Sequence, residues 1–106
     1  MGARKLAIQP ELFLVGEAED GIVASVMAGY EGHRGWVNYL VVAPAFRGRG
    51  YGRALMQHVE AALKRCGCPK VSLLVRGSNH DAMKFYRRLG YAEDESVSFG
   101  KRLIED

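Results

Sequence analysis

Three glycines and three arginines alternate within the stretch VVAPAFRGRGYGRALM, residues 41–56. Glycine in a helix interior costs about 1 kcal/mol relative to alanine, so a glycine-rich helix start needs a reason. Because glycine has no Cβ, it lets an anion approach the unpaired N–H groups of a helix N-terminus. Arginines add positive charge and bidentate hydrogen bonds to phosphate oxygens. The pattern predicts a diphosphate site made by Arg47, Gly48, Arg49, Gly50, Gly52 and Arg53.

The spacing of these glycines argues against the two commonest nucleotide-binding loops. The dinucleotide fingerprint requires G-x-G-x-x-G, whereas the spacing here is G-x-G-x-G. The P-loop requires Gly-Lys-Ser/Thr, which does not follow here. A flexible loop and an arginine-glycine RNA-binding segment are alternatives, although such RNA-binding segments belong to disordered tails rather than to a strand–helix junction.

Charge is distributed unevenly along the 106 residues, whose net charge is +3. Residues 1–46 carry three basic and five acidic side chains, residues 47–88 ten and two, and residues 89–106 two and five. The middle segment is therefore either a positive field suited to a polyanionic ligand or a solvated basic helix face. Nucleic-acid binding is disfavoured, because interleaved aromatics and a helix-turn-helix pattern are missing from the sequence.

The composition excludes some further classes. The sequence has no apolar run near the ~20 residues that span a bilayer, and it begins without the hydrophobic segment of a secretory signal. We therefore expect a cytoplasmic protein without a membrane partner. Cys66 and Cys68 are the only cysteines, which predicts reduced thiols and no metal site. With 48% hydrophobic residues and no evident linker, residues 1–106 are expected to form a single domain.

Three strands are predicted before the glycine loop, over residues 11–15, 22–30 and 36–42. Asp20-Gly21 between the first two is typical of a tight hairpin turn. The third strand is apolar at nearly every position, so we expect both of its faces to be covered.

After the loop, apolar residues recur at three- and four-residue steps from Tyr51 to Cys66. This period predicts an amphipathic helix that ends at Gly67. Residues 71–75 predict a short buried strand, so that strand, helix and strand form a parallel crossover.

A second helix is predicted to open at Ser78, with Asp81 three residues later completing a capping box, and to end at Gly90. Beyond it, the segments ESVSF and KRLI carry weaker strand signals.

The run Arg47-Gly48-Arg49-Gly50-Tyr51-Gly52 fits R/Q-x-x-G-x-G/A, and in this the chain resembles the GNAT superfamily of acyl-CoA-dependent N-acyltransferases. The second helix resembles the family's Asn…FY…LGY pattern, at Asn79, Phe85, Tyr86 and Leu89-Gly90-Tyr91. The resemblance covers roughly residues 11–104 and is nearest to the small bacterial YpeA type. It implies an α+β fold, with a mixed, mostly antiparallel sheet and a β-α-β unit that binds CoA.

The resemblance also implies acetyl-CoA as co-substrate and an amine acceptor, which could be a small molecule, a peptide N-terminus or a lysine. The amides of residues 48–53 would bind the CoA pyrophosphate, the backbone of residues 40–42 would pair with the pantetheine arm, and Asn79 would contact that arm or the phosphate region. The family's general acid maps onto Tyr86. The implied cofactor-binding residues are Leu40, Val41, Val42, Arg47, Gly48, Arg49, Gly50, Tyr51, Gly52, Arg53, Asn79 and Phe85.

Tyr86 suits an acid role chemically, because a phenol with a pKa of about 10 can give its proton to a departing thiolate at neutral pH. From periodicity alone it fits a core aromatic as well. Asn79 and Tyr86 are two helical turns apart and would share a helix face at about 10 Å. A covalent route through Cys66 is disfavoured, because it lies about 24 Å from the phosphate end of its helix. Direct attack in a ternary complex is therefore expected.

The sequence does not decide which residue acts as the general base. The strand over residues 36–42 carries no carboxylate, whereas Glu31 and His33 lie on the turn before it. Either side chain could act directly or through water, or be a surface turn residue.

The family usually begins with a strand and two helices, which MGARKLAIQP cannot encode. We therefore expect an N-terminally truncated form of the fold, or one completed by another subunit. The strand over residues 11–15 would then expose an unpaired edge, which predicts a homodimer or aggregation through that edge. An N-acetyltransferase is the leading function, and a non-catalytic acyl-CoA-binding module or truncated remnant is the alternative.

Overall fold

The computed structural model describes residues 12–19 and 21–104. They fall into two compact units, the first ending at Val75 and the second beginning at Arg76. The prediction of a single domain over residues 1–106 stays a prediction.

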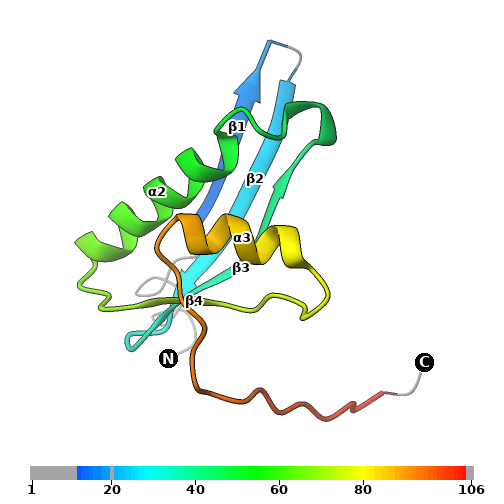
Figure 1. Cartoon of the computed structure of the whole chain (residues 1–106). Helices are drawn as coiled ribbons and strands as arrows, with labels where there is room; N and C mark the ends of the chain where they lie inside the picture. The colour runs from blue at the N-terminus through cyan, green and yellow to red at the C-terminus, as the bar shows by residue number, and fades with distance from the viewer. Residues whose placement is uncertain (1–11, 20, 105–106) are drawn as a thin grey trace. The chain divides into compact units, whose positions relative to one another are not determined.

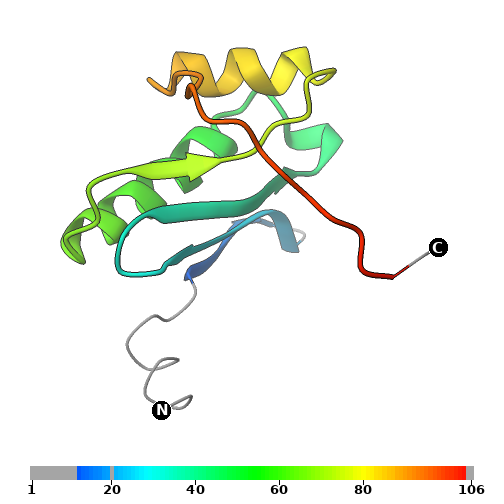
Figure 2. The ribbon, with the colours of Figure 1, turned by 90° about the horizontal axis from the view of Figure 1, so that it is seen from below.

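The first unit is built on a four-stranded sheet in the order β1-β2-β3-β4. Figure 2 shows the strands in this order, from blue β1 to yellow-green β4. The three long strands pair antiparallel as predicted, and β4 pairs parallel to β3. Their bounds are Leu12–Ala18 for β1, Gly21–Tyr30 for β2, Gly35–Val42 for β3 and Val71–Leu73 for β4.

The helix α2 (Tyr51–Arg65) connects β3 to β4 and lies along one face of the sheet (Figure 1). A short 3-10 helix, η1 (Pro44–Phe46), precedes it. Met56 and Val59 of α2 are fully buried, as is Val26 of β2. Each such side chain contributes roughly 1.5–3 kcal/mol through burial. The predicted amphipathic helix, parallel crossover and α+β class are confirmed.

The prediction that both faces of β3 are covered is wrong. Within the first unit α2 covers one face, and on the other Tyr39 and Val41 are 38% and 54% exposed. An apolar run therefore did not mark a strand buried on both sides. The fourth strand is also shorter than predicted, because β4 ends at Leu73 and the next residue, Leu74, is 75% exposed.

A β-bulge interrupts β3 at Asn38. Val37 pairs with Ala28 and Tyr39 pairs with Met27, which leaves Asn38 as an extra residue in the ladder. A bulge bends a strand and increases its twist. The parallel pairing of β3 with β4 stops at Val37, where the bulge begins.

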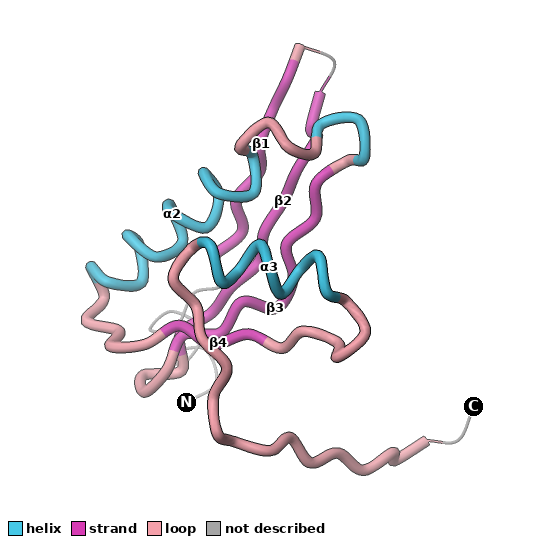
Figure 3. Tube along the Cα trace, in the orientation of Figure 1, coloured by secondary structure: helices cyan, strands magenta, loops and turns pink. Residues whose placement is uncertain are grey.

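The second unit contains the helix α3 (His80–Arg88), and Figure 3 shows the tail that follows it as loop. Asn79, not Ser78, is the N-cap, because its side-chain oxygen accepts a hydrogen bond from the Ala82 N–H at 3.1 Å. The predicted Ser78–Asp81 capping box is therefore wrong by one residue, although Asp81 lies in the first turn, where the helix dipole favours an acid. The strand signals in the tail are not realised, since residues 91–104 contain no strand.

The edge position of β1 predicts self-association. Among the described residues β1 pairs only with β2, and Phe13 on this strand is 56% exposed. Charged side chains on an edge strand oppose edge-to-edge pairing. We expect Phe13→Lys to lower the sedimentation coefficient at high concentration toward that of an 11.7 kDa monomer. Phe99→Lys, in the exposed tail of the second unit, is the matched control. A wild-type chain that sediments as a monomer at every concentration would contradict the prediction.

Candidate functional site

The loop between β3 and α2 adopts a conformation that requires glycine. Gly48 and Gly50 have φ angles of 78° and 89°, in the left-handed region that other residues rarely enter. Gly50 is the N-cap of α2; no side chain caps it, and the first turn contains no acidic residue. A Cβ built at either glycine would meet nothing within 4 Å. The helix therefore presents its free N–H groups and positive dipole end to open space, as an anion site requires.

Tyr51 holds this loop to the sheet. Its hydroxyl donates to the Glu17 carbonyl at 3.4 Å, and its ring stands edge-on to Phe46 with centroids 6.0 Å apart. A Cβ at Gly16 of β1 would lie 2.8 Å from the Tyr51 ring, so only glycine leaves room for it. The side chain of Tyr51 thus positions the loop, which leaves its backbone N–H for the predicted role in cofactor binding.

The three arginines have different environments. Arg47 Nε donates to the Val42 carbonyl at 3.1 Å, and the Arg49 guanidinium lies over the Phe46 ring at 5.0 Å. Arg53 is exposed in the first turn of α2, beside the buried Gly52. A guanidinium has five N–H donors, so Arg47 and Arg49 keep donors for a phosphate.

The backbone of β3 opens beyond its bulge. The Ala43 N–H donates to the Val23 carbonyl on β2, whereas the Val42 carbonyl receives the Arg47 side chain. Backbone groups of successive strand residues point to alternate sides, so Leu40 shares the direction of Val42 and Val41 faces β2. Of the three predicted pantetheine contacts, Leu40 and Val42 therefore have backbone groups suited to an added strand.

The second unit carries the predicted acid. Tyr86 is half-buried, with ring centroids 5.0 Å from Phe85 and 5.8 Å from Tyr91. Burial raises the pKa of the Tyr86 phenol above its ordinary value of 10.0. The Asn79 side-chain oxygen is used in the helix cap, which leaves its N–H₂ group as the donor for a ligand.

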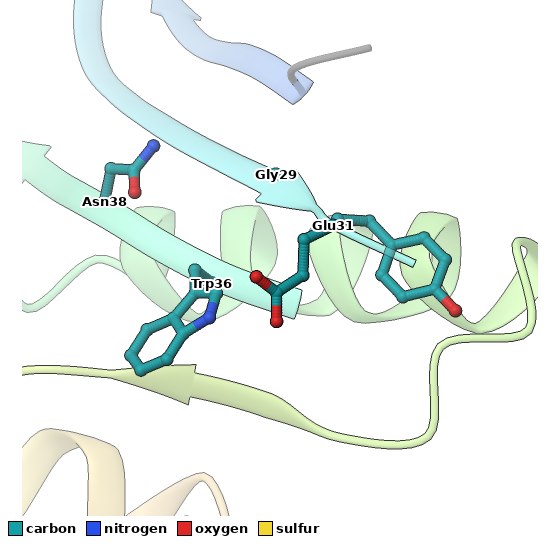
Figure 4. Close-up of a pocket in the computed structure, with 5 residues that line it drawn as sticks. Gly29, Glu31, Trp36 and Asn38 are labelled. Carbon is teal, nitrogen blue, oxygen red and sulfur yellow. The ribbon is translucent and has the colours of Figure 1, made fainter. Parts of the chain in front are cut away.

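A feature that sequence reasoning missed is a hollow of about 280 Å³ at the junction of β2 and β3, lined by Gly29, Tyr30, Glu31, Trp36 and Asn38 (Figure 4). The sequence marked Glu31 as a possible base but did not associate it with the aromatic residues. The bulge at Asn38, which decides the faces of β3, has no sequence signal that we recognise. His33 is exposed on the same turn and does not line the hollow.

The two cysteines make no metal site with the described residues. Cys66 and Cys68 are free thiols, and the Cys68 thiol donates to the Lys70 carbonyl at 3.2 Å. No group of three or more His, Cys, Asp or Glu side chains in the described part of the chain could hold a metal ion. Among the described helices, none has the length and apolarity needed to cross a bilayer.

The first unit thus contains a β-α-β unit whose helix begins at an uncapped, glycine-rich loop, as the resemblance to acyl-CoA-dependent acyltransferases implies. The sequence model of the Acetyltransferase (GNAT) family matches residues 2–91. The chain therefore belongs to the GNAT family of acetyltransferases, enzymes whose acetyl donor is acetyl-CoA.

Similar proteins agree with this membership. The chain is 50% identical over 103 residues to an acetyltransferase of Pectobacterium atrosepticum and 48% identical over 103 residues to one of Yersinia enterocolitica. Each comparison covers 97% of this chain and 73% of the relative. The fold is similar to an aminoglycoside N-acetyltransferase in complex with CoA, with a TM-score of 0.81 and 20% identity over 97% of this chain and 84% of that one.

The loop glycines give a direct test of the anion site. In Gly50→Ala the positive φ of 89° strains the backbone by about 1–2 kcal/mol, and the new Cβ enters the space left for the ligand. Gly67→Ala is the matched control, with a φ of 83° and equally open surroundings at the other end of α2. Both variants should lose similar stability.

Only Gly50→Ala should lose affinity for CoA. The measurement is a thermal-shift titration with acetyl-CoA, CoA and, as a control anion, ATP. At 100 times its dissociation constant, a ligand should stabilise the wild type by about 2.7 kcal/mol. Equal stabilisation of both variants by CoA would contradict this location of the site.

Proposed function

We propose that the protein transfers the acetyl group of acetyl-CoA to a primary amine by direct attack in a ternary complex. The single observation that carries the proposal is the uncapped, glycine-built N-terminus of α2 beside the opened backbone edge of β3. The first feature suits a diphosphate and the second suits an extended amide chain, and both are chemical parts of CoA.

We also propose that the protein acts in the cytoplasm.

In this proposal the residues that bind the donor have separate tasks. The backbone N–H groups of residues 48–53 bind the pyrophosphate, and Arg47, Arg49 and Arg53 add charge-assisted contacts. Leu40 and Val42 pair with the amides of the pantetheine arm. Phe85 and the Asn79 amide of the second unit contribute the remaining contacts to the donor.

The proposed reaction needs one nucleophile, one acid and one base. The neutral amine nitrogen attacks the thioester carbon, the C–S bond breaks, and the departing thiolate takes the Tyr86 phenol proton. The nitrogen loses a proton to water or to a base, for which Glu31 and His33 remain the candidates. The proton that the nitrogen releases returns to Tyr86 through solvent. The products are then the N-acetylated amine and the free CoA thiol.

The acceptor in this proposal is an amine, as in the aminoglycoside acetyltransferase whose fold the chain shares. A small molecule, a peptide N-terminus and a lysine are all compatible with the acyl transfer itself. A non-catalytic acyl-CoA-binding module is the second candidate. The two candidates differ in whether the protein turns over acetyl-CoA with an amine, and in whether that turnover depends on the Tyr86 hydroxyl.

Removal of the Tyr86 hydroxyl should lower turnover while leaving the donor bound. In Tyr86→Phe we expect kcat to fall by about 10²–10⁴-fold, the contribution typical of a general acid, with acetyl-CoA affinity unchanged. Tyr91→Phe is the matched control, since it removes the hydroxyl of the adjacent ring and keeps the ring itself. Release of free CoA thiol with an excess of amine measures the rate. If Tyr86→Phe and Tyr91→Phe turn over equally, Tyr86 is not the acid.

The raised pKa of Tyr86 sets the alkaline side of the pH profile. Burial favours the neutral phenol, so the midpoint at which Tyr86 loses its proton lies above pH 10.0. We expect the ratio of wild-type kcat to Tyr86→Phe kcat to stay constant between about pH 7 and pH 9.5. A decline of that ratio centred near pH 8 would show that a more acidic group supplies the proton.

A further inference from the structure

We infer that Cys66 and Cys68 are a site of reversible oxidation, at which the two thiols form a disulfide that releases the start of β4 from β3. The disulfide closes across Gly67, in the turn between α2 and β4. The inference goes beyond the proposed acetyl transfer and does not depend on it, because the turn lies at the opposite end of α2 from the glycine loop.

The turn after α2 brings the two cysteines close together. Gly67 has a φ of 83°, the left-handed conformation in which helices commonly end. The N–H groups of Cys66 and Cys68 both donate to the Leu63 carbonyl, each at 3.0 Å. The Cα atoms of residues two apart are separated by at most about 7 Å, and a turn shortens this toward the 5.5–6 Å typical of a disulfide. A bridge between the two cysteines therefore requires no large movement of the backbone.

The two thiols have unequal environments. Cys66 is exposed, whereas Cys68 is half-buried. The Cys68 thiol donates to the Lys70 carbonyl at 3.2 Å, and a Cβ built at Gly35 would lie 3.0 Å from the Cys68 Sγ atom. An oxidant therefore reaches Cys66 first, and Cys68 is placed to attack the product of that first step.

Positive charge around the turn suits an anionic oxidant. Lys64 and Arg65 lie in the last turn of α2, and Lys70 follows the two cysteines. From residue 61 to residue 75 the sequence contains no Asp or Glu. Low-molecular-weight disulfides such as glutathione disulfide carry carboxylates, so this segment attracts them.

The oxidation balances with a low-molecular-weight disulfide as the oxidant. The Cys66 thiolate attacks one sulfur of that disulfide, its S–S bond breaks, and one thiolate leaves. The Cys68 thiolate then attacks the Cys66 Sγ atom, a second thiolate leaves, and the bond between Cys66 and Cys68 forms. The departing thiolates take up the protons that the protein thiols lose. The protein is thus oxidised by two electrons, and the oxidant is reduced to two thiols.

The disulfide changes the contacts of Cys68 at the start of the β3–β4 ladder. The Lys70 carbonyl accepts from the Cys68 thiol and, at 2.9 Å, from the Gly35 N–H. Gly35 and Val71 are the first pair of that ladder, which has three pairs. A sulfur bonded to Cys66 has no proton to donate, and it turns away from Gly35. Because the ladder is so short, the loss of a contact at its first pair should loosen β4.

Reaction with glutathione disulfide tests the bridge. After alkylation of free thiols, mass spectrometry should show a wild-type chain that has lost two hydrogen atoms and gained no alkyl group, and dithiothreitol should restore both thiols. Cys68→Ser should stop at the mixed disulfide of Cys66 with glutathione, because no second thiol displaces it. Cys66→Ser should react at least about tenfold more slowly, since Cys68 is half-buried. A wild-type chain that stays unreacted, or that accumulates a mixed or intermolecular disulfide, would overturn the inference.

Hydrogen exchange tests the release of β4. Oxidation of the wild-type chain should speed exchange of the β3–β4 ladder amides about fivefold, as expected for the loss of one hydrogen bond. Reduced Cys68→Ala should show the same increase, because it removes the same contacts. Reduced Cys66→Ala is the matched control and should exchange like the reduced wild type. The amides of the β1–β2 ladder are the internal reference. Equal exchange of the β3–β4 ladder in the oxidised and reduced wild type would overturn the release of β4, and the inference with it.

Discussion

The N-terminus of α2 is the constraint on which the candidate site depends. A helix start is usually stabilised by about 1 kcal/mol through a Ser, Thr, Asp or Asn cap, and Gly50 provides no such side chain. The conformation is held instead by Tyr51, whose ring fits against Gly16 and Phe46. The helix therefore has free N–H groups in a fixed place. A bound diphosphate would supply the hydrogen bonds that a cap would otherwise make.

One extra residue in β3 marks the place where the sheet opens. The bulge at Asn38 coincides with the end of the β3–β4 ladder, and this exposes the backbone that suits the pantetheine arm. It also brings the Asn38 amide to the hollow that Trp36 and Glu31 line. A regular ladder would have continued to pair β3 with β4 and would have closed that edge. The bulge, the end of the β3–β4 ladder and the hollow thus lie at one place in the strand.

The sequence predicted what depends on local pattern. The spacing of Gly48, Gly50 and Gly52 predicted where α2 begins, and the apolar period predicted how far the helix extends. What it missed depends on tertiary register. The apolar strand β3 is covered by α2 on one face only. The N-cap of α3 is Asn79 rather than Ser78. Serine and asparagine are both good N-caps, so the sequence alone did not decide between these neighbours. The hollow went unpredicted because its lining residues come together only through the pairing of β2 with β3.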